Sequence, residues 1–119
     1  MLKHDYLEAQ IEALCKTIAA VIFGSEAIKK IFKKYEDEKE ASDPMHEKFL
    51  ELKLLDLLKQ NQTEEARAWI FSAVSKAPNI RRLIFALDGY NKLREAKCLS
   101  ESEIERDLSQ IRSLYDAGD

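Results

Sequence analysis

The side chains that most often act as general bases and metal ligands are scarce in this sequence, which has two histidines, His4 and His46, and two cysteines. His46 lies close to Asp43 and Glu47, and a carboxylate paired with an imidazole could exchange protons with a substrate. Neither a nucleophile nor a third ligand is spaced to complete a site, and no His-x3-His or Glu-x2-His motif occurs. We interpret these residues as helix-capping and surface residues, and we expect no catalytic residue and no metal site.

The cysteines and glycines form no chemical motif either. Cys15 and Cys98 lie far apart and outside any Cys-x2-Cys or Cys/His spacing, which predicts small buried side chains in a reducing cytoplasm. Gly24, Gly89 and Gly118 are scattered, so no glycine-rich turn is present to hold a phosphate group, and we expect no cofactor. The chain is therefore predicted not to be an enzyme. One alternative stays open, an enzyme of unrecognised type whose carboxylates are brought together only by the fold.

The charge pattern argues against a polyanionic partner. The chain has 19 basic and 22 acidic residues and a formal net charge of −3, so its overall field repels nucleic acid. The sharpest local feature is the basic segment KKIFKK at residues 29–34, which the acidic residues at 36–38 partly neutralise. Because a mixed charge run usually faces water, we interpret this segment as a solvated helix face.

Composition and hydrophobic spacing predict one all-α domain over residues 1–119. The chain is 45% hydrophobic and 34% charged, and no stretch alternates with period two for long enough to form a strand. We expect five or six helices packed as successive antiparallel hairpins, with N-terminal helices at about 5–40, a central hairpin at about 44–78 and a C-terminal hairpin at about 79–116. Signal-peptide features are absent and the longest apolar run, IAAVIF, is too short to cross a membrane, which predicts a cytoplasmic protein.

The first predicted helix carries a heptad-like apolar seam. Leu7, Ile11, Leu14 and Ile18 recur with alternating steps of four and three residues, and the helix is expected to continue until Gly24 breaks it. Such a seam could pair with the same helix of a second copy. A homodimeric structural protein that uses this helix is therefore one functional alternative, and packing within the subunit is the other interpretation of the seam.

The helix predicted after Asp43 and Pro44 is apolar on nearly all sides. Its large apolar residues are Phe49, Leu50, Leu52, Leu54, Leu55, Leu57 and Leu58. A helix of this kind has to be covered on several sides, so we place it at the centre of the domain. Thr63 is expected to cap a further helix, and two more helices are predicted from about Asn79 and from Ser100, which has the spacing of a capping box with Glu103.

The central hairpin contains a turn residue, an acidic–alanine pair, a bulky residue, a second alanine and a closing proline in a fixed order. These positions are held by Asn61, Glu65, Ala66, Ile70, Ala73 and Pro78. The pattern resembles the second helix of a tetratricopeptide repeat, and Leu50 and Leu57 suit the large positions of the first helix, where Lys53 and Leu54 depart from the family. The resemblance covers residues 45–79 and implies a tetratricopeptide-like right-handed helical array.

This resemblance also implies a function, that of a protein–protein or peptide interaction module. In the register of the repeat, Lys48, Glu51, Leu55 and Lys59 fall on the concave side of a groove for an extended peptide or a partner helix. The two lysines would be the partners of a carboxylate or phosphate. The hairpin could equally serve as core packing alone, because such arrays normally need three or more units. The partner, an unknown protein or peptide, is not identified by the sequence.

The N-terminal segment HDYLEAQIEALCKTIAAVIFG, residues 4–24, resembles the opening of a family of small uncharacterised bacterial helical proteins. The likeness implies a bacterial cytoplasmic protein and no known activity.

Overall fold

The computed structural model describes residues 9–35 and 44–116, and the regular elements within these residues are α-helices. A helical stretch at 9–14 precedes α2 (Ile18–Phe23), α3 (Ser25–Tyr35), α4 (Pro44–Lys59), α5 (Thr63–Lys76), α6 (Ile80–Glu95) and α7 (Glu101–Asp116). The all-α prediction is confirmed, with slightly more helical segments than the five or six expected. His4, Leu7 and Asp43 lie outside the described residues.

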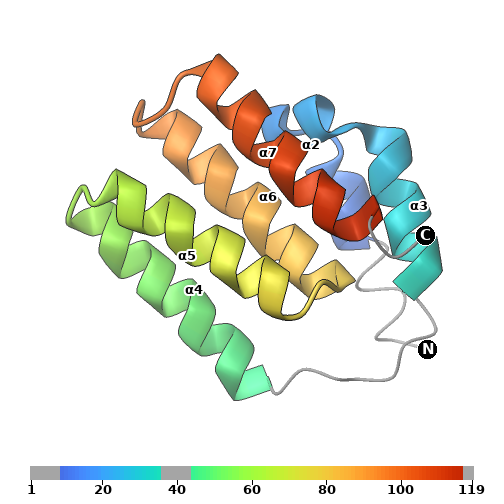
Figure 1. The fold of residues 1–119 in the computed structure, drawn as a ribbon, viewed down its shortest axis with the longest axis horizontal. Coiled ribbons are helices and arrows are strands. Elements are labelled where there is room, and N and C mark those ends of the chain that lie inside the picture. The colour runs from blue at the N-terminus through green and yellow to red at the C-terminus, as the bar shows by residue number, and fades with distance from the viewer. Residues whose placement is uncertain (1–8, 36–43, 117–119) are drawn as a thin grey trace.

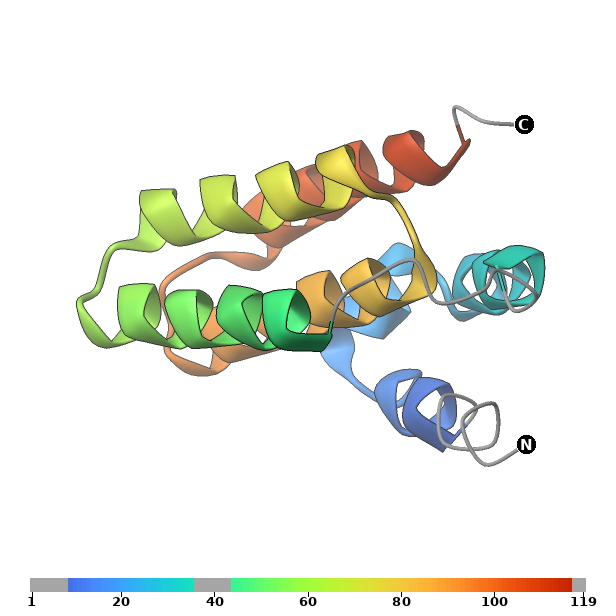
Figure 2. The ribbon, with the colours of Figure 1, turned by 90° about the horizontal axis from the view of Figure 1, so that it is seen from below.

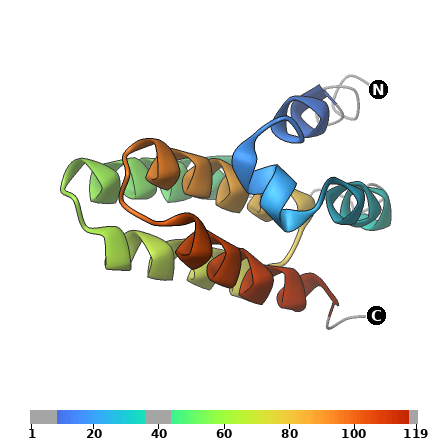
Figure 3. The same ribbon diagram turned by 90° about the horizontal axis from the view of Figure 1, so that it is seen from above.

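The four longest helices form two layers. Helices α4 and α6 lie in one layer and α5 and α7 in the other (Figure 2), and the view from above gives the same arrangement (Figure 3). Consecutive helices from α4 to α7 run in alternating directions, while α2 and α3 lie at the opposite side of the molecule from α4 (Figure 1). None of the described helices combines the length and apolarity that crossing a bilayer requires.

Helix α6, and not α4, lies at the centre of the fold. It packs against α2, α3, α4, α5 and α7, whereas α4 packs mainly on α5 and to a lesser extent on α6. Only one face of α4, with Leu50, Leu54 and Leu57, is buried. The prediction that α4 is central is therefore wrong. Apolar residues around a helix indicate how much of its surface needs to be buried, but they do not indicate which other elements bury it.

Gly89 lets α6 occupy the central position. A Cβ at this residue would lie 2.8 Å from Ile70 Cδ1 and 3.0 Å from Leu54 Cδ2, so α4 and α5 approach the α6 backbone there. Glycine usually weakens a helix interior, but α6 continues through Gly89 to Glu95. The close packing of three helices accounts for a glycine in the interior of this helix.

The first predicted helix is interrupted. The helical stretch ends at Leu14, and α2 begins at Ile18 after a turn in which Thr17 Oγ1 donates to the Leu14 carbonyl at 2.6 Å. The Thr17 hydroxyl also caps α2, and Asn91 Oδ1 of α6 accepts from the Ala19 backbone N–H at 3.0 Å. A threonine and a long-range partner thus break a periodic apolar pattern that, read alone, predicts one continuous helix.

Several predicted turn and cap residues behave as expected because their chemistry is local. Gly24 and Asn61 adopt positive φ values of 109° and 57° at the ends of α2 and α4. Ser100 and Glu103 form the capping box, with the Glu103 carboxylate accepting from Ser100 N at 3.0 Å. Thr63 differs from its prediction, since it is the first residue of α5 and Gln62 precedes it without a side-chain cap.

The basic segment lies as predicted, and the cysteines do not. The four lysines of residues 29–34 are exposed while Ile31 and Phe32 are buried, which confirms a solvated helix face on α3. Cys15 and Cys98 are free thiols that are only half-buried, so the prediction of buried cysteines is wrong.

We predict that Gly89→Ala lowers the free energy of unfolding by about 1–3 kcal/mol, the usual effect of overpacking a core. Ile70 and Leu54 are buried, so neither methyl group can move into solvent. Urea denaturation measures the effect. In an exposed helix interior the same change would instead stabilise by about 1 kcal/mol.

The variant Ile70→Val removes the Cδ1 atom that the new Cβ would meet, and it provides the control. In the Ile70→Val background, Gly89→Ala should lower the free energy of unfolding by a smaller amount than in the wild type. The coupling free energy between the two sites should be about 0.5 kcal/mol or more. An equal cost in both backgrounds would contradict the role given to the close approach.

Candidate functional site

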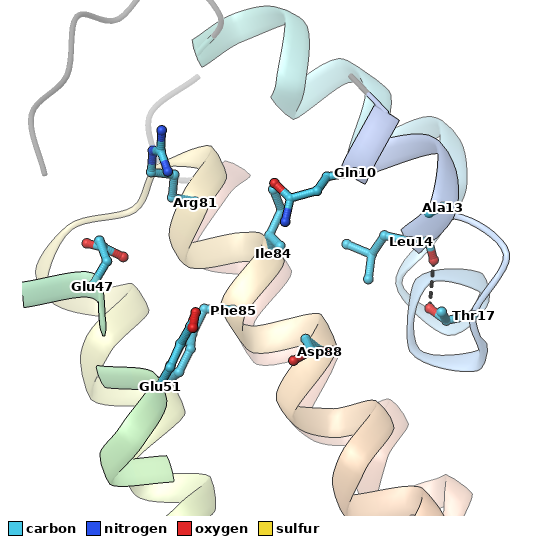
Figure 4. A pocket seen from close by; sticks show the side chains of 10 residues that line it. All are labelled: Gln10, Ala13, Leu14, Thr17, Glu47, Glu51, Arg81, Ile84, Phe85 and Asp88. Atoms are coloured by element: carbon cyan, nitrogen blue, oxygen red, sulfur yellow. Dashed lines mark hydrogen bonds between the residues drawn. The ribbon is translucent and has the colours of Figure 1, made fainter. Parts of the chain in front are cut away.

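A groove of about 400 Å³ lies between α4, α6 and the helical stretch at 9–14. Helix α6 forms its floor with Ile84, Phe85 and Asp88, and Glu47 and Glu51 of α4 form one wall (Figure 4). The volume lies within the range of about 300–1,000 Å³ that is typical of ligand sites. The groove is therefore large enough for one or a few side chains of a partner.

The α4 wall is held by a buried arginine of α6. Arg82 is 5% exposed, and its Nε donates to Glu47 Oε2 at 2.9 Å while its Nη1 donates to the Ala73 carbonyl at 2.6 Å. These bonds fix the first turn of α4 and the end of α5 to the start of α6. Since every one of these partners lies in a helix, the wall is rigidly placed.

The opposite wall is formed by Gln10, Ala13 and Leu14, with Thr17 at its end. Ile11 and Leu14 are buried against the core, whereas Ala13 is exposed. The wall exists because the chain turns after Leu14, so that the stretch at 9–14 leaves the direction of α2 (Figure 3).

The rim of the groove carries more acidic than basic groups. Glu47, Glu51 and Asp88 face a single lining cation, Arg81. Glu47 is bound by Arg82, and Asp88 forms an ion pair with Lys92. Glu51 is exposed and has no ion-pair partner within the described part of the chain. Because Arg82 and Lys92 balance Glu47 and Asp88, Glu51 is the rim carboxylate that is left to bind a cationic group above the apolar floor.

The groove offers binding surface and little reactive chemistry. Its lining contains no histidine or cysteine, and within residues 9–35 and 44–116 no group of three or more His, Cys, Asp or Glu side chains could hold a metal ion. Two of its three carboxylates are already engaged in ion pairs. An apolar floor with a polar rim is typical of a surface that binds a peptide or protein segment.

The residues predicted for the peptide groove are all exposed on α4, but only Glu51 lines the groove. Lys48, Leu55 and Lys59 lie farther around the helix, on its outer side. The sequence prediction did not include the floor, because the apolar residues of α6 have the spacing of an ordinary core face. The signal was the row of Arg81, Ile84 and Asp88, which mixes charged and apolar side chains at one-turn intervals.

The residues predicted for the dimer seam divide between two helical segments. Leu7 lies outside the described residues, Ile11 and Leu14 are buried within the subunit, and Ile18 of α2 is 38% exposed. The seam is therefore not presented on one continuous helix.

The possible acid–base couple at His46 is not assembled within the described residues. The His46 side chain is exposed and its ring stacks with Phe49 at a centroid distance of 6.4 Å. The neighbouring Glu47 carboxylate is bound to Arg82.

Residues 1–116 match a family of unknown function, DUF6483. The chain belongs to this family. No curated protein and no solved structure matches the chain significantly. Membership of DUF6483 agrees with the predicted likeness to a small uncharacterised family and implies no activity, so function has to be argued from the residues.

The DUF6483 fold also contains a cluster of titratable groups between α5, α6 and α7. The Asp107 carboxylate accepts two bonds from Arg67, from Nε at 2.7 Å and from Nη2 at 2.8 Å, and a third from the Tyr90 hydroxyl at 2.8 Å. Glu64 lies 3.0 Å and Glu103 3.7 Å from Arg67 Nη1. Every polar atom at the centre of this cluster has a partner, which is typical of a structural network.

The network shifts the pKa values of its members. Burial by itself would raise the pKa of Asp107, but the bonds from Arg67 and Tyr90 outweigh it and hold that pKa below its usual value. Burial, and then the bond to Asp107, raise the pKa of Tyr90 well above its usual range, and the Asp107 bond raises that of Arg67. The network is therefore stable as carboxylate, guanidinium and neutral phenol.

We predict that the free energy of unfolding falls at both ends of the pH scale. The lowered pKa of Asp107 contributes stability above the ordinary carboxyl pKa of about 4, and this contribution is lost as the pH falls through the folded value. The raised pKa of Tyr90 contributes stability below about pH 10, which is lost as the pH rises further. Urea denaturation as a function of pH measures both slopes.

Asp107→Asn should lower the free energy of unfolding at neutral pH by about 1–3 kcal/mol, because Arg67 loses its bidentate carboxylate partner and keeps only the weaker pairs with Glu64 and Glu103. In the same variant, the free energy of unfolding should depend less on pH in the acid range. Asp88→Asn is the matched control, since its exposed pair with Lys92 is worth less than about 1 kcal/mol. Equal effects of the two substitutions would contradict the importance of the network.

Proposed function

We propose that this protein is a non-enzymatic cytoplasmic interaction module that binds a segment of a protein partner in the groove between α4, α6 and the stretch at 9–14. The observation that carries the proposal is the groove itself, with its apolar floor on α6 and the exposed Glu51 carboxylate at its rim. A partner segment with apolar and basic side chains matches both parts.

The arrangement of α4 to α7 supports a tetratricopeptide-like array. The α4–α5 pair is followed by the α6–α7 pair, and α5 packs against both α4 and α6. The residues that carry the likeness, among them Ala66, Ile70 and Ala73, are buried. In such an array the first helices of each pair, here α4 and α6, line the binding surface, and the groove lies on these two helices.

The two alternatives from the sequence have less support. An enzyme would need reactive groups that converge, whereas two of the three groove carboxylates are held in ion pairs. A homodimer through the first helix would need its seam exposed, whereas Ile11 and Leu14 are buried within the subunit. Ile18→Glu, measured by the concentration dependence of the mass, tests that dimer.

We predict that Ala13→Trp blocks partner binding, because Ala13 is exposed and its new indole would fill the groove. Peptides selected on the wild-type protein from a displayed random library should bind the variant at least about tenfold more weakly, a loss of about 1.4 kcal/mol or more. Fluorescence polarisation measures the Kd. Ala96→Trp, at an exposed alanine after α6, is the matched control and should bind like wild type.

Lys48→Glu/Lys59→Glu tests the wider groove predicted from the repeat register. If a bound segment continues over the outer side of α4, this double variant should also lose binding without unfolding, because both lysines are exposed. Peptides that bind Ala13→Trp as tightly as wild type would contradict the proposed function, and unchanged binding to the double variant would confine the site to the α6 floor.

A further inference from the structure

The outer face of α4 is apolar and open to solvent. Phe49 and Leu52 are each 54% exposed and Leu55 is 41% exposed, and Met45 precedes them with 80% exposure. These residues follow one another at three- or four-residue intervals, so they share one side of the helix. We call this surface, with the neighbouring Trp69 of α5, the α4 edge.

The α4 edge is locally ordered by aromatic contacts. The Phe49 and Trp69 rings meet edge to face at a centroid distance of 6.0 Å, and Lys53 Nζ lies 6.0 Å from the Trp69 ring. Trp69 Nε1 donates to the Leu50 carbonyl at 3.1 Å, which fixes the indole. The apolar surface is therefore presented by side chains that are already held in place.

The α4 edge lies at one end of the helical array, where no further described helix of the array buries it. Helix α2 packs against α6 and α7, whereas α4 lies at the opposite end of the array (Figure 1). Terminal units of stacked helical pairs normally have a polar outer face. Here the α4 end exposes four large apolar side chains, Met45, Phe49, Leu52 and Leu55, whereas α2 exposes two, Ile18 and Val21.

We propose that the α4 edge is the interface of a homodimer in which the α4 helices of two copies pack antiparallel about a two-fold axis at Leu52. The occupant is a second copy because the exposed charges of α4 complement themselves about Leu52. A face that complements itself about a two-fold axis forms a single closed pair.

The charges that flank Leu52 select the antiparallel arrangement. Lys48 and Asp56 lie at equal distances on either side of Leu52, and both are exposed. In an antiparallel pair, residues equally far from the axis lie at the same height, so each copy's Lys48 is level with the other's Asp56. A parallel pair would instead place Lys48 beside Lys48, which is repulsive. The same symmetry brings Phe49 level with Leu55 and Leu52 level with itself.

The dimer is separate from the groove of the proposed function. The groove floor belongs to α6, and Ala13 lies on the stretch at 9–14, so neither is part of the α4 edge. Peptide binding and self-association can therefore fail independently. Ala13→Trp should remain a dimer, and Leu52→Glu should still bind peptides selected on the wild type.

Sedimentation equilibrium over a range of protein concentrations tests the dimer. The wild type should approach twice the 13.7 kDa chain mass, and Leu52→Glu should be a monomer. Because Leu52 is exposed, the variant should fold, and its urea denaturation in the monomeric range verifies this. Val21→Glu places the same charge at a residue that is 61% exposed on α2, and this matched control should stay dimeric.

A charge exchange tests the antiparallel register. Lys48→Asp should raise the dimer Kd at least about tenfold, because two carboxylates would then lie level across the axis. Adding Asp56→Lys to the same chain should restore the wild-type Kd. These residues are two helical turns apart within one α4, so a contact inside the subunit cannot produce the rescue.

Four results would overturn the proposal. They are a wild-type mass that stays monomeric at every concentration, a dimer that survives Leu52→Glu, assemblies that keep growing beyond two copies, and a double exchange that fails to restore the dimer. A monomeric wild type would assign the α4 edge to a different protein or to a lipid surface.

Discussion

The Asp107 carboxylate is the constraint on which the arrangement of α5, α6 and α7 depends. Its side chain is only 12% exposed and therefore needs donors within the fold, which Arg67 and Tyr90 supply from two different helices. A shift of any of the three helices along its axis would separate the carboxylate from these donors. The Tyr115 hydroxyl, which donates to the Asn79 carbonyl at 2.6 Å, fixes the other end of α7 against the start of α6 in the same way.

Helix α6 connects this network to the candidate site. Tyr90 anchors it to α7, Arg82 anchors α4 and α5 to it, and Asn91 accepts a hydrogen bond from a backbone N–H of α2. Since α6 is packed by helices on most sides, the strip that carries Ile84, Phe85 and Asp88 is the part of it that borders the groove. The groove thus forms because both of its walls are attached to α6. Arg82 holds α4 on one side, and on the other side the stretch at 9–14 leaves the direction of α2 after Leu14.

The sequence predicted the features that depend on neighbouring residues and missed those that depend on distant ones. The helix ends at Gly24, Asn61 and the Ser100–Glu103 box follow from local backbone chemistry, which a sequence displays directly. The break at Thr17 depends also on Asn91, which is far away in the chain. For the candidate site, the repeat register located Glu51 on the wall, but the floor could not be found because Phe85 looks like any core residue until the packing of α4 is known.

The largest error of the sequence interpretation and the open surface of the structure have one physical cause. The apolar circumference of α4 correctly indicates a helix that needs cover on several sides, and the subunit supplies cover on only one. A contiguous exposed apolar patch of this kind usually marks an interaction surface. Asp56 accepts a hydrogen bond from Gln60, just after the end of α4, but its symmetric placement with Lys48 about Leu52 has no use inside one helix, because these two residues are two turns apart and do not touch. Both the excess of leucines and the placement of these charges are explained when the missing cover comes from outside the subunit.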